Sequence, residues 1–202
     1  MPLLIASTNE GKLREIGLLL RGLALPIRSL NDLPPTPEPD ETGATFPENA
    51  RIKAHAYAAA SGLVTLAEDS GLAIDALGGR PGVHSARYPG ATYPEKFANL
   101  WKELATHKRP WTSRYVCAIA VVSGGTGGVL FETVATVEGE IWNEARGTSG
   151  FGYDPVFYYP PYGKTFGEVG DEDKLAVAHR GQAIAGFRNW VEREGLPSML
   201  DR

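Results

Sequence analysis

The chain opens with a short apolar segment that leads through a polar turn into a helical pattern, and this order strongly limits the fold. Residues 3–6 (Leu-Leu-Ile-Ala) are typical of a buried strand. After the polar residues 7–9, Leu13, Ile16 and Leu20 recur at the spacing of one helix face. A strand, a polar turn and a helix form the opening half of an α/β unit. We therefore predict an α/β fold.

Strands and helices continue to alternate, which predicts a mixed, twisted central sheet with flanking helices. Thr45 and Glu48 form a capping box at the start of a helix that runs to Ser61. The Gly-rich residues 124–128 join two β-rich segments and predict a hairpin. Because a hairpin follows the alternating part, the sheet is expected to be mixed rather than purely parallel. The other expected elements are strands over residues 63–67, 72–77, 115–122 and 129–137 and helices from Thr92 and from about Arg180.

Composition and charge exclude several classes of protein. With 43% hydrophobic residues, 24 Gly and 15 Pro, the chain is globular and rich in loops. A net charge of −4 disfavours a general binder of nucleic acid polymers. The single cysteine, Cys117, allows no intrachain disulfide and fits a reducing compartment. Because Cys117 lies inside an apolar strand pattern, we expect its thiol to be buried and inert. The start lacks a secretory signal and the longest apolar run, 116–122, is too short to span a membrane. We expect one soluble, cytoplasmic domain over residues 1–202.

The turn after the first strand is a candidate phosphate site. Small polar residues there leave backbone N–H groups at a helix N-terminus, where phosphate binds well, and Lys12 adds a positive charge. The segment is not a Walker loop, because Ala6 replaces the first glycine and Leu13 replaces the metal-binding Ser or Thr. An ordinary capped helix start is the alternative. The predicted phosphate-binding residues are Ser7, Thr8, Asn9, Glu10, Gly11 and Lys12.

An acidic set offers candidate ligands for a metal ion, and it comprises Glu38, Asp40, Glu41, Glu68 and Asp69. Mg²⁺ prefers carboxylate oxygens together with substrate phosphates and retained waters. Asp69 lies in Glu68-Asp69-Ser70-Gly71, which we expect to be a tight turn between two strands. A turn aspartate that makes only local backbone bonds is the alternative. Glu41 follows a proline-rich loop and fits a solvated surface charge equally well.

A Gly-rich segment and a basic segment near the C-terminus are candidates for contact with a base. Phe151 and Tyr153 are separated by Gly152 and suit stacking on a flat ring, while Asp154 would accept hydrogen bonds from ring N–H groups. A loop whose aromatic residues belong to the core is the alternative. Near the start of the final helix, Arg180 would hold phosphate or a base edge and His179 would donate hydrogen bonds. Lys164 and Lys174 belong to the same group, and a solvated helix end is the alternative for these lysines. Cations at a helix N-terminus oppose the helix dipole, which favours a functional role for His179 and Arg180.

Taken together, these segments resemble the inosine triphosphate pyrophosphatases. They occur in the order typical of that family and cover almost the whole chain. One difference is Ala178, where the family usually has Ser before His-Arg, and it affects one hydroxyl near the base. The matching segments are residues 6–12, 41–43, 46–50 with Lys53, 67–72, 77–83, 85–88, 150–155 and 163–166, and Lys174 with residues 179–181.

The resemblance implies two lobes around a deep cleft, usually in a homodimer. It also implies Mg²⁺-dependent hydrolysis of purine nucleoside triphosphates with a deaminated base (ITP, dITP and XTP) to the monophosphate and pyrophosphate. By the same resemblance Glu41 and Asp69 would bind the metal, Asp69 would be the base toward water, and Ser70 would touch the substrate. The residues expected around the nucleoside and phosphate are Phe151, Gly152, Tyr153, Asp154, Lys174, His179 and Arg180.

Selection of the base follows from hydrogen-bonding chemistry. Hypoxanthine and xanthine carry a ring N1–H and a 6-oxo group, whereas adenine has an acceptor N1 and an amino group. A site built for the oxo form leaves its own donors unpaired against adenine, at a cost of about 1–3 kcal/mol per buried group. We predict that His179 and Arg180 donate to the 6-oxo oxygen.

Two alternatives stay open at this point. A Maf-type nucleotide pyrophosphatase is disfavoured because its opening loop typically carries Ser-Pro-Arg-Arg where this chain has Thr-Asn-Glu-Gly-Lys. A nucleotide-sensing regulator without turnover is disfavoured by the presence of both Asp69 and Glu41, because binding alone does not require a metal-held water.

Overall fold

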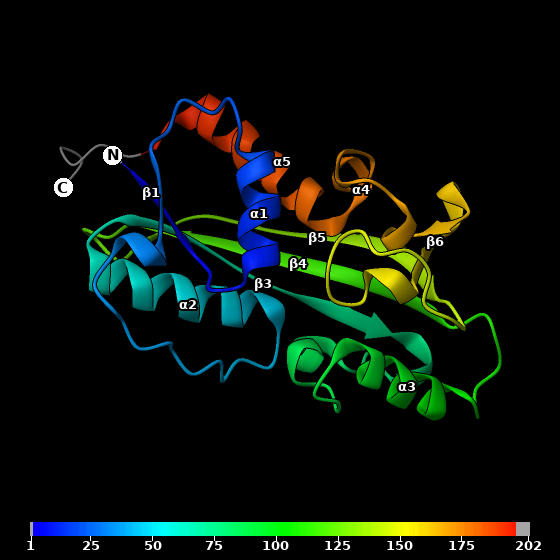
Figure 1. Cartoon of the computed structure of the whole chain (residues 1–202). Coiled ribbons are helices and arrows are strands. Elements are labelled where there is room, and N and C mark those ends of the chain that lie inside the picture. Colours follow the sequence, from blue (N-terminus) through cyan, green and yellow to red (C-terminus); the bar gives the residue numbers. More distant parts are fainter. Residues whose placement is uncertain (1, 197–202) are drawn as a thin grey trace. The chain divides into compact units, whose positions relative to one another are not determined.

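The computed structural model describes residues 2–196, which contain seven β-strands and five α-helices (Figure 1). The strands are β1 (Leu3–Ala6), β2 (Ile27–Ser29), β3 (Val64–Ile74), β4 (Thr112–Val122), β5 (Val129–Ile141), β6 (Phe157–Tyr159) and β7 (Lys164–Thr165). The helices are α1 (Glu10–Leu19), α2 (Phe46–Ser61), α3 (Tyr93–Leu104), α4 (Asp171–Val177) and α5 (His179–Glu194).

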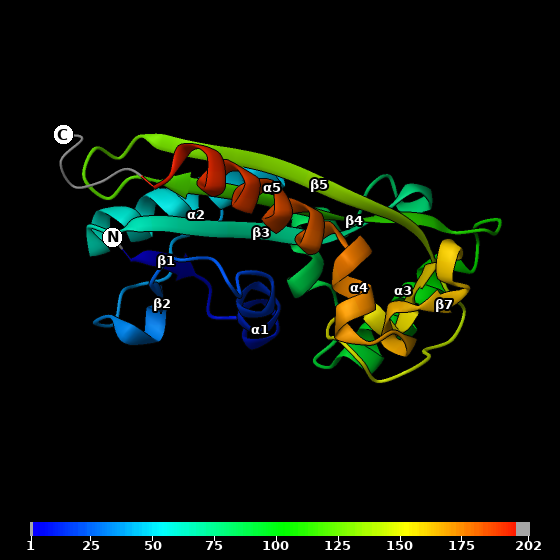
Figure 2. The same cartoon turned by 90° about the horizontal axis from the view of Figure 1, so that it is seen from above.

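All seven strands belong to one mixed sheet, as predicted, in the order β2-β1-β3-β4-β5-β6-β7. β1 lies between β2 and β3 and is parallel to both, with Leu3 opposite Ile27 and Val64 (Figure 2). At the other end of the order, β6 is antiparallel to β5 and to β7. β4 and β5 follow each other in the chain and are neighbours in the sheet, which confirms the predicted hairpin.

The described chain divides into two compact units, and each has its own core. Unit 1 comprises residues 2–69, 117–135 and 180–196, and unit 2 comprises residues 70–116 and 136–179. The divisions fall inside β3, β4 and β5 and between His179 and Arg180.

In unit 1, strand alternation separates two hydrophobic clusters. Leu3 and Ile5 of β1 belong to the cluster of α1 and α5, whereas Leu4 and Ala6 belong to the cluster of α2. Figure 1 shows α1 and α5 on one side of β1 and β3 and α2 on the other. The residues that α5 contributes are Ala183, Ile184, Phe187 and Val191, and those of α2 are Ala50, Ala54, Tyr57 and Ala58. The small alanines allow α2 to approach the strands closely.

In unit 2, the core is dominated by aromatic rings. The rings of Tyr115 and Phe157 stack with centroids 4.3 Å apart, and Phe166 lies 5.1 Å from Phe157. α3 adds further apolar side chains and begins after Thr92, whose hydroxyl accepts a hydrogen bond from the Glu95 N–H. Both predicted helix starts with a Thr cap are therefore confirmed, since Thr45 caps α2 in the same way.

One sequence prediction about the fold is wrong. Residues 68–71 do not form a turn, because β3 runs without interruption from Val64 to Ile74. The strand predicted over 72–77 ends at Ile74, and a 3₁₀ turn follows over Asp75–Leu77. The acidic pair Glu68 and Asp69 indicated a loop because charged residues are rarely buried. In the structure each carboxylate has a cation on its own face of the strand, so the strand continues.

Candidate active site

The candidate phosphate site lies between the end of β1 and the start of α1. Asn9 is the helix cap, and its Oδ1 accepts a hydrogen bond from the Lys12 N–H at 3.0 Å. The Ser7 hydroxyl oxygen accepts one from the Asn9 N–H at 3.2 Å. This confirms the predicted strand, polar turn and helix start. The first turn of such a helix carries N–H groups and a partial positive charge that suit an anion.

Lys12 is held in place by a buried carboxylate. Its Nζ lies 3.0 Å from Glu68 Oε1, and 17% of its side chain is exposed. Glu68 also accepts two hydrogen bonds from Arg180, from Nε to Oε2 at 2.8 Å and from Nη2 to Oε1 at 3.0 Å. Burial disfavours the charge on Glu68, but Arg180 and Lys12 outweigh burial and hold its pKa well below the usual range.

Arg180 is shared between two glutamates. Its third guanidinium contact goes to Glu15 Oε2 at 2.6 Å, and both side chains are almost completely buried. Burial acts against the Arg180 charge, but Glu68 in particular raises the pKa of the guanidinium above its ordinary value. The cluster of Lys12, Glu15, Glu68 and Arg180 therefore joins α1, β3 and α5. It contains two acidic and two basic side chains, which is how buried charges are normally tolerated.

On the opposite face of β3, Asp69 meets a second lysine. Lys53 Nζ lies 2.9 Å from Asp69 Oδ1 and 2.6 Å from Glu41 Oε1, so one ammonium group contacts both predicted metal ligands. Burial disfavours the charged lysine, but Asp69 and Glu41 outweigh this and raise the Lys53 pKa. Glu41 comes from the loop before α2, and Lys53 comes from α2 itself. The structure thus brings Glu41 and Asp69 together, as a shared metal site requires.

The donors present fit Mg²⁺. Two hard carboxylate groups already accommodate one positive charge between them, and Asp69 is buried. Within residues 2–196, three or more His, Cys, Asp or Glu side chains do not gather into a group that could hold a metal ion. One or two carboxylates completed by substrate phosphates and water is the usual arrangement for Mg²⁺. Glu41 and Asp69 are the residues that would hold it.

In unit 2, Asp154 organises the predicted Gly-rich segment. Its Oδ2 accepts hydrogen bonds from Lys174 Nζ at 2.5 Å and from the Phe151 N–H at 2.8 Å. Its Oδ1 accepts one from the Tyr115 hydroxyl at 3.2 Å. Asp154 and Lys174 are buried, and the Lys174 ammonium lies 5.3 Å from the centre of the Phe151 ring. Three predicted residues, Phe151, Asp154 and Lys174, therefore lie together.

Close packing around Asp154 requires glycine at position 150. Gly150 has φ +73°, and a Cβ there would lie 2.0 Å from Asp154 Oδ2. A further ring, that of His179, stacks on Tyr115 with centroids 4.7 Å apart. Tyr153 donates from its hydroxyl to the Ser85 carbonyl at 2.9 Å and is buried. The aromatic segment is thus partly core, and only Phe151 keeps intermediate exposure next to a cation.

The predicted site residues are divided between the two units. Unit 1 holds residues 7–12, Glu41, Asp69 and Arg180, and unit 2 holds Ser70, residues 151–154, Lys174 and His179. Sequence reasoning did not assign a role to Lys53, Glu15 or Tyr115. Lys53 belongs to the segments that carry the family resemblance, but no pattern singled out Glu15, whose partner Arg180 comes from a distant part of the chain. Tyr115 gave no signal beyond an aromatic residue in a strand.

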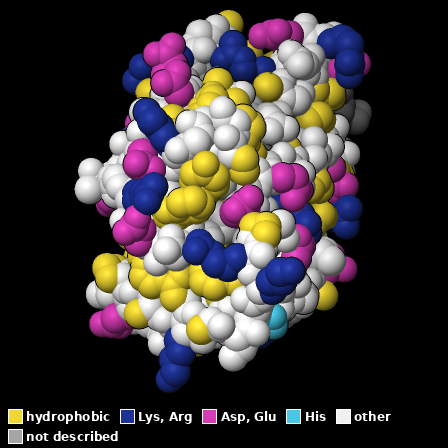
Figure 3. Space-filling view, turned by 90° about the vertical axis from the view of Figure 1, so that its right-hand side faces the viewer, with side chains coloured by type: hydrophobic (Ala, Val, Ile, Leu, Met, Phe, Trp, Pro, Cys, Tyr) yellow, Lys and Arg dark blue, Asp and Glu magenta, His cyan; other side chains and the backbone are white. Residues whose placement is uncertain are grey.

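The surface carries both positive and negative side chains (Figure 3), as the small net charge of the sequence indicates. On the face seen in Figure 3, Lys and Arg side chains lie beside Asp and Glu side chains, with apolar patches between them. Among the residues that the structure describes, we find no helix with the length and apolar character needed to cross a membrane.

The mixed seven-stranded sheet and the polar strand-to-helix turn after β1 define an α/β protein. Comparison with known proteins is more specific: a model described as the Ham1 family matches residues 3–190. The chain therefore belongs to the Ham1 family, which confirms the resemblance found in the sequence.

Individual relatives cover nearly the full chain. A protein of Geobacillus kaustophilus named dITP/XTP pyrophosphatase is 43% identical over 197 residues, which are 96% of each chain. A protein of the same name from Geobacter sulfurreducens is 42% identical over 197 residues, covering 96% of this chain and 98% of its own. A solved structure of a HAM1 protein from Coxiella burnetii superposes with a TM-score of 0.85 at 38% identity, over 95% of this chain and 98% of that chain.

Proposed function

We propose that this chain is an enzyme that hydrolyses purine nucleoside triphosphates with a deaminated base, such as dITP, XTP and ITP. The products are the monophosphate and pyrophosphate, and the effect is to remove altered nucleotides from the nucleotide pool. The names of the Geobacillus and Geobacter relatives support this substrate class. The observation that carries the proposal is the pairing of Asp69 with Glu41 around Lys53, in the same unit as Lys12 at the start of α1.

The chemistry requires attack of water on the α-phosphorus and departure of pyrophosphate. Asp69 is the proposed base, because a carboxylate beside the reacting water can orient and deprotonate it, a role typically worth about 10²–10⁴-fold in rate. Lys12, with the first turn of α1, would bind the phosphates and stabilise the charge that develops on the leaving group. Mg²⁺ bound to Glu41 and Asp69 would supply neutralisation of the triphosphate charge.

The nucleoside contacts in the proposal are those that the sequence predicts. Within unit 2, Phe151 lies against Lys174, which suits stacking on a base next to a cation. Donation from His179 and Arg180 to a 6-oxo group stays a prediction. Three of the hydrogen bonds of Arg180 go to Glu68 and Glu15, within unit 1.

The proposal includes three properties that rest on the family resemblance: dependence on Mg²⁺, a homodimer and a cytoplasmic location. Dependence on Mg²⁺ has the further support of the two adjacent carboxylates described above. The sole cysteine, Cys117, is buried and free, which is compatible with a reducing compartment.

The experiment separates an enzyme from a nucleotide sensor. Wild type and Asp69→Asn are compared for pyrophosphate release from dITP with Mg²⁺, and for binding of dITP by calorimetry. We expect Asp69→Asn to lose at least about 10²-fold in kcat, because the base and a proposed Mg²⁺ ligand are lost together. The dITP affinity measured in EDTA should be largely kept, because the proposed phosphate-binding residues are unchanged. Binding by the wild type without any pyrophosphate release would instead support the sensor. A near-normal kcat for Asp69→Asn would remove Asp69 from the base role.

A further inference from the structure

Asn49 makes two side-chain contacts that connect the candidate metal ligands. It lies in the first part of α2 and is 1% exposed. Its Oδ1 accepts a hydrogen bond from the Gly43 N–H at 2.8 Å, and its Nδ2 donates to Asp69 Oδ2 at 3.4 Å. Gly43 lies two residues after Glu41, so one amide group contacts both Asp69 and the turn that carries Glu41.

Asn49 and Lys53 act on the two oxygens of Asp69 separately. They are four residues apart on α2 and therefore lie on the same helix face. Lys53 contacts Oδ1 of Asp69, whereas Asn49 contacts Oδ2. A carboxylate that is held at both oxygens has a defined rotation about its own bond axis. The direction in which Asp69 presents its lone pairs is thus set by α2.

The contact with Gly43 leaves no room for a side chain at that position. A Cβ on Gly43 would lie 2.6 Å from Asn49 Oδ1 and 2.6 Å from the Glu48 Cβ. Contacts shorter than about 3 Å require movement of the neighbour, so any larger residue would push the Asn49 amide or the turn aside. Position 43 therefore offers a second way to disturb the same link without changing Asn49.

We propose that Asn49 is a positioning residue that fixes Asp69 and the Glu41 turn in the arrangement needed for Mg²⁺ and substrate. The inference rests on the proposed function, in which these carboxylates hold the metal. Hydrogen-bond partners behind metal ligands commonly contribute about 10–100-fold to metal affinity or activity. Asn49 touches neither the phosphates nor the reacting water in this account, and it acts through Asp69 and Glu41.

The test compares Asn49→Ala and Gly43→Ala with two matched controls. Asn99→Ala removes an exposed asparagine on α3 whose Nδ2 donates only to the Pro89 carbonyl among its described contacts. Gly17→Ala places a Cβ on α1 where no atom lies within 4 Å. The probe is the α,β-methylene analogue of ITP, which resists cleavage at the scissile position. Its dissociation constant is measured by calorimetry with Mg²⁺ and again with EDTA, and pyrophosphate release from dITP is measured in parallel.

In the wild type we expect Mg²⁺ to tighten binding of the analogue. In Asn49→Ala and Gly43→Ala, the factor by which Mg²⁺ lowers the dissociation constant of the analogue should be smaller by about 10-fold or more. We expect a matching loss in kcat. The affinity of these variants in EDTA should stay within about twofold of the wild-type affinity. The two controls should stay within about twofold of the wild type in affinity and in kcat. A merely structural role would weaken binding equally with Mg²⁺ and with EDTA, and it would lower the unfolding midpoint.

Two results would overturn the inference while leaving the proposed function intact. One is a wild-type enzyme that releases pyrophosphate together with an Asn49→Ala variant whose gain from Mg²⁺ is unchanged. The other is an equal loss of affinity with and without Mg²⁺. A wild-type protein that releases no pyrophosphate from dITP would instead count against the proposed function itself. If Asn49→Ala does not fold, Gly43→Ala carries the same comparison.

Discussion

At the scale of single residues, Lys12 is the side chain on which the proposed phosphate binding most depends. Its ammonium group is fixed by Glu68, and Glu68 is also paired with Arg180. Because Arg180 shares the negative charge of Glu68, Lys12 is oriented without being fully neutralised. A lysine held in this way loses less side-chain entropy when it binds an anion.

Replacement of Lys12 by alanine should therefore weaken the affinity for triphosphate more than turnover. A hydrogen bond to a charged group contributes about 1.5–3 kcal/mol, which corresponds to a rise in KM of roughly 10- to 100-fold. Steady-state kinetics with dITP measures this change. Lys108→Ala, at an exposed position, is the control. An unchanged KM in Lys12→Ala would refute the phosphate role of the α1 start.

Cys117 should be chemically inert in the folded protein. It is fully buried, and its thiol donates to Glu68 Oε2 at 3.2 Å. Burial first, and then the Glu68 charge, raise the pKa of the thiol well above its ordinary value. A raised pKa keeps the unreactive protonated form at pH 8. We expect iodoacetamide at pH 8 to label Cys117 only after unfolding in urea, as followed by mass spectrometry, and rapid labelling of the native protein would contradict this environment.

At the scale of elements, the strand β3 explains why two adjacent acids have different partners. Side chains alternate across a strand, so Glu68 faces the cluster of α1 and α5 while Asp69 faces α2. The contacts follow this division, with Arg180 and Lys12 on one face and Lys53 on the other. Glu68 therefore contacts Lys12 at the start of α1, and Asp69 contacts Lys53 on the other face, where its proposed role as base lies.

Replacement of Glu68 or Asp69 by its amide should affect stability and turnover differently. Glu68→Gln leaves buried cations without a full counter-charge and should lower the free energy of unfolding by about 3 kcal/mol. Asp69→Asn should leave stability closer to the wild type and mainly abolish turnover. Urea unfolding and pyrophosphate release measure the two effects. Equal loss of stability in both variants would argue against this division of roles.

The helices α2 and α3 could be predicted from the sequence, whereas the full length of strand β3 could not. Local signals were sufficient for the starts of α2 and α3, because a Thr cap acts within one helical turn. The unbroken strand β3 could not be predicted, since its acids are stabilised by Arg180 and Lys53, which come from distant parts of the chain. Glu15 and Asn49 were missed for the same reason, as their partners meet only in the fold.

At the scale of the whole molecule, the family to which the chain belongs bears on which nucleotides it hydrolyses. The chain belongs to the Ham1 family and matches it over residues 3–190. The surplus of glycine found in the sequence includes positions such as Gly43 and Gly150, where a Cβ would collide with Asn49 or Asp154. Part of the loop content thus serves close packing around the candidate site residues of each unit. The mixed surface charge in Figure 3 and the net charge of −4 suit a small Mg-bound nucleotide better than a nucleic acid polymer.

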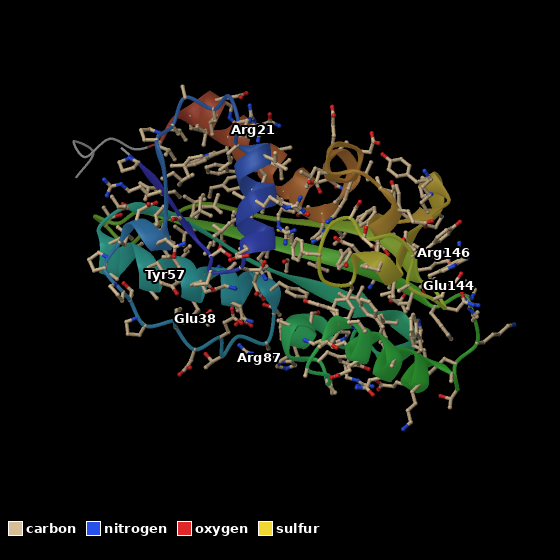
Figure 4. All side chains as sticks on the ribbon, in the orientation of Figure 1. Arg21, Glu38, Tyr57, Arg87, Glu144 and Arg146 are labelled. Carbon is tan, nitrogen blue, oxygen red and sulfur yellow. The ribbon has the colours of Figure 1, made fainter. Side chains whose placement is uncertain are left out.

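Contacts at the end of α1 hold the helix to which we assign the proposed phosphate binding. Arg188 of α5 donates to the carbonyl oxygens of Leu19 and Arg21, each at 2.8 Å. Figure 4 labels Arg21 at this end of α1. A cation at the C-terminal end of a helix is favourable to its dipole. α1 is therefore fixed by α5 at its far end and by the buried charge cluster nearer its start.

The decisive comparison is pyrophosphate release from dITP and dATP by the wild-type protein, measured side by side with Mg²⁺ at matched concentrations. The two substrates differ only in the base, so their kcat/KM ratio reports base selection directly. We expect a kcat/KM at least about tenfold higher for dITP, because adenine would leave buried donors unpaired at about 1–3 kcal/mol per group. Equal kcat/KM values for dITP and dATP, or release of orthophosphate in place of pyrophosphate, would contradict it.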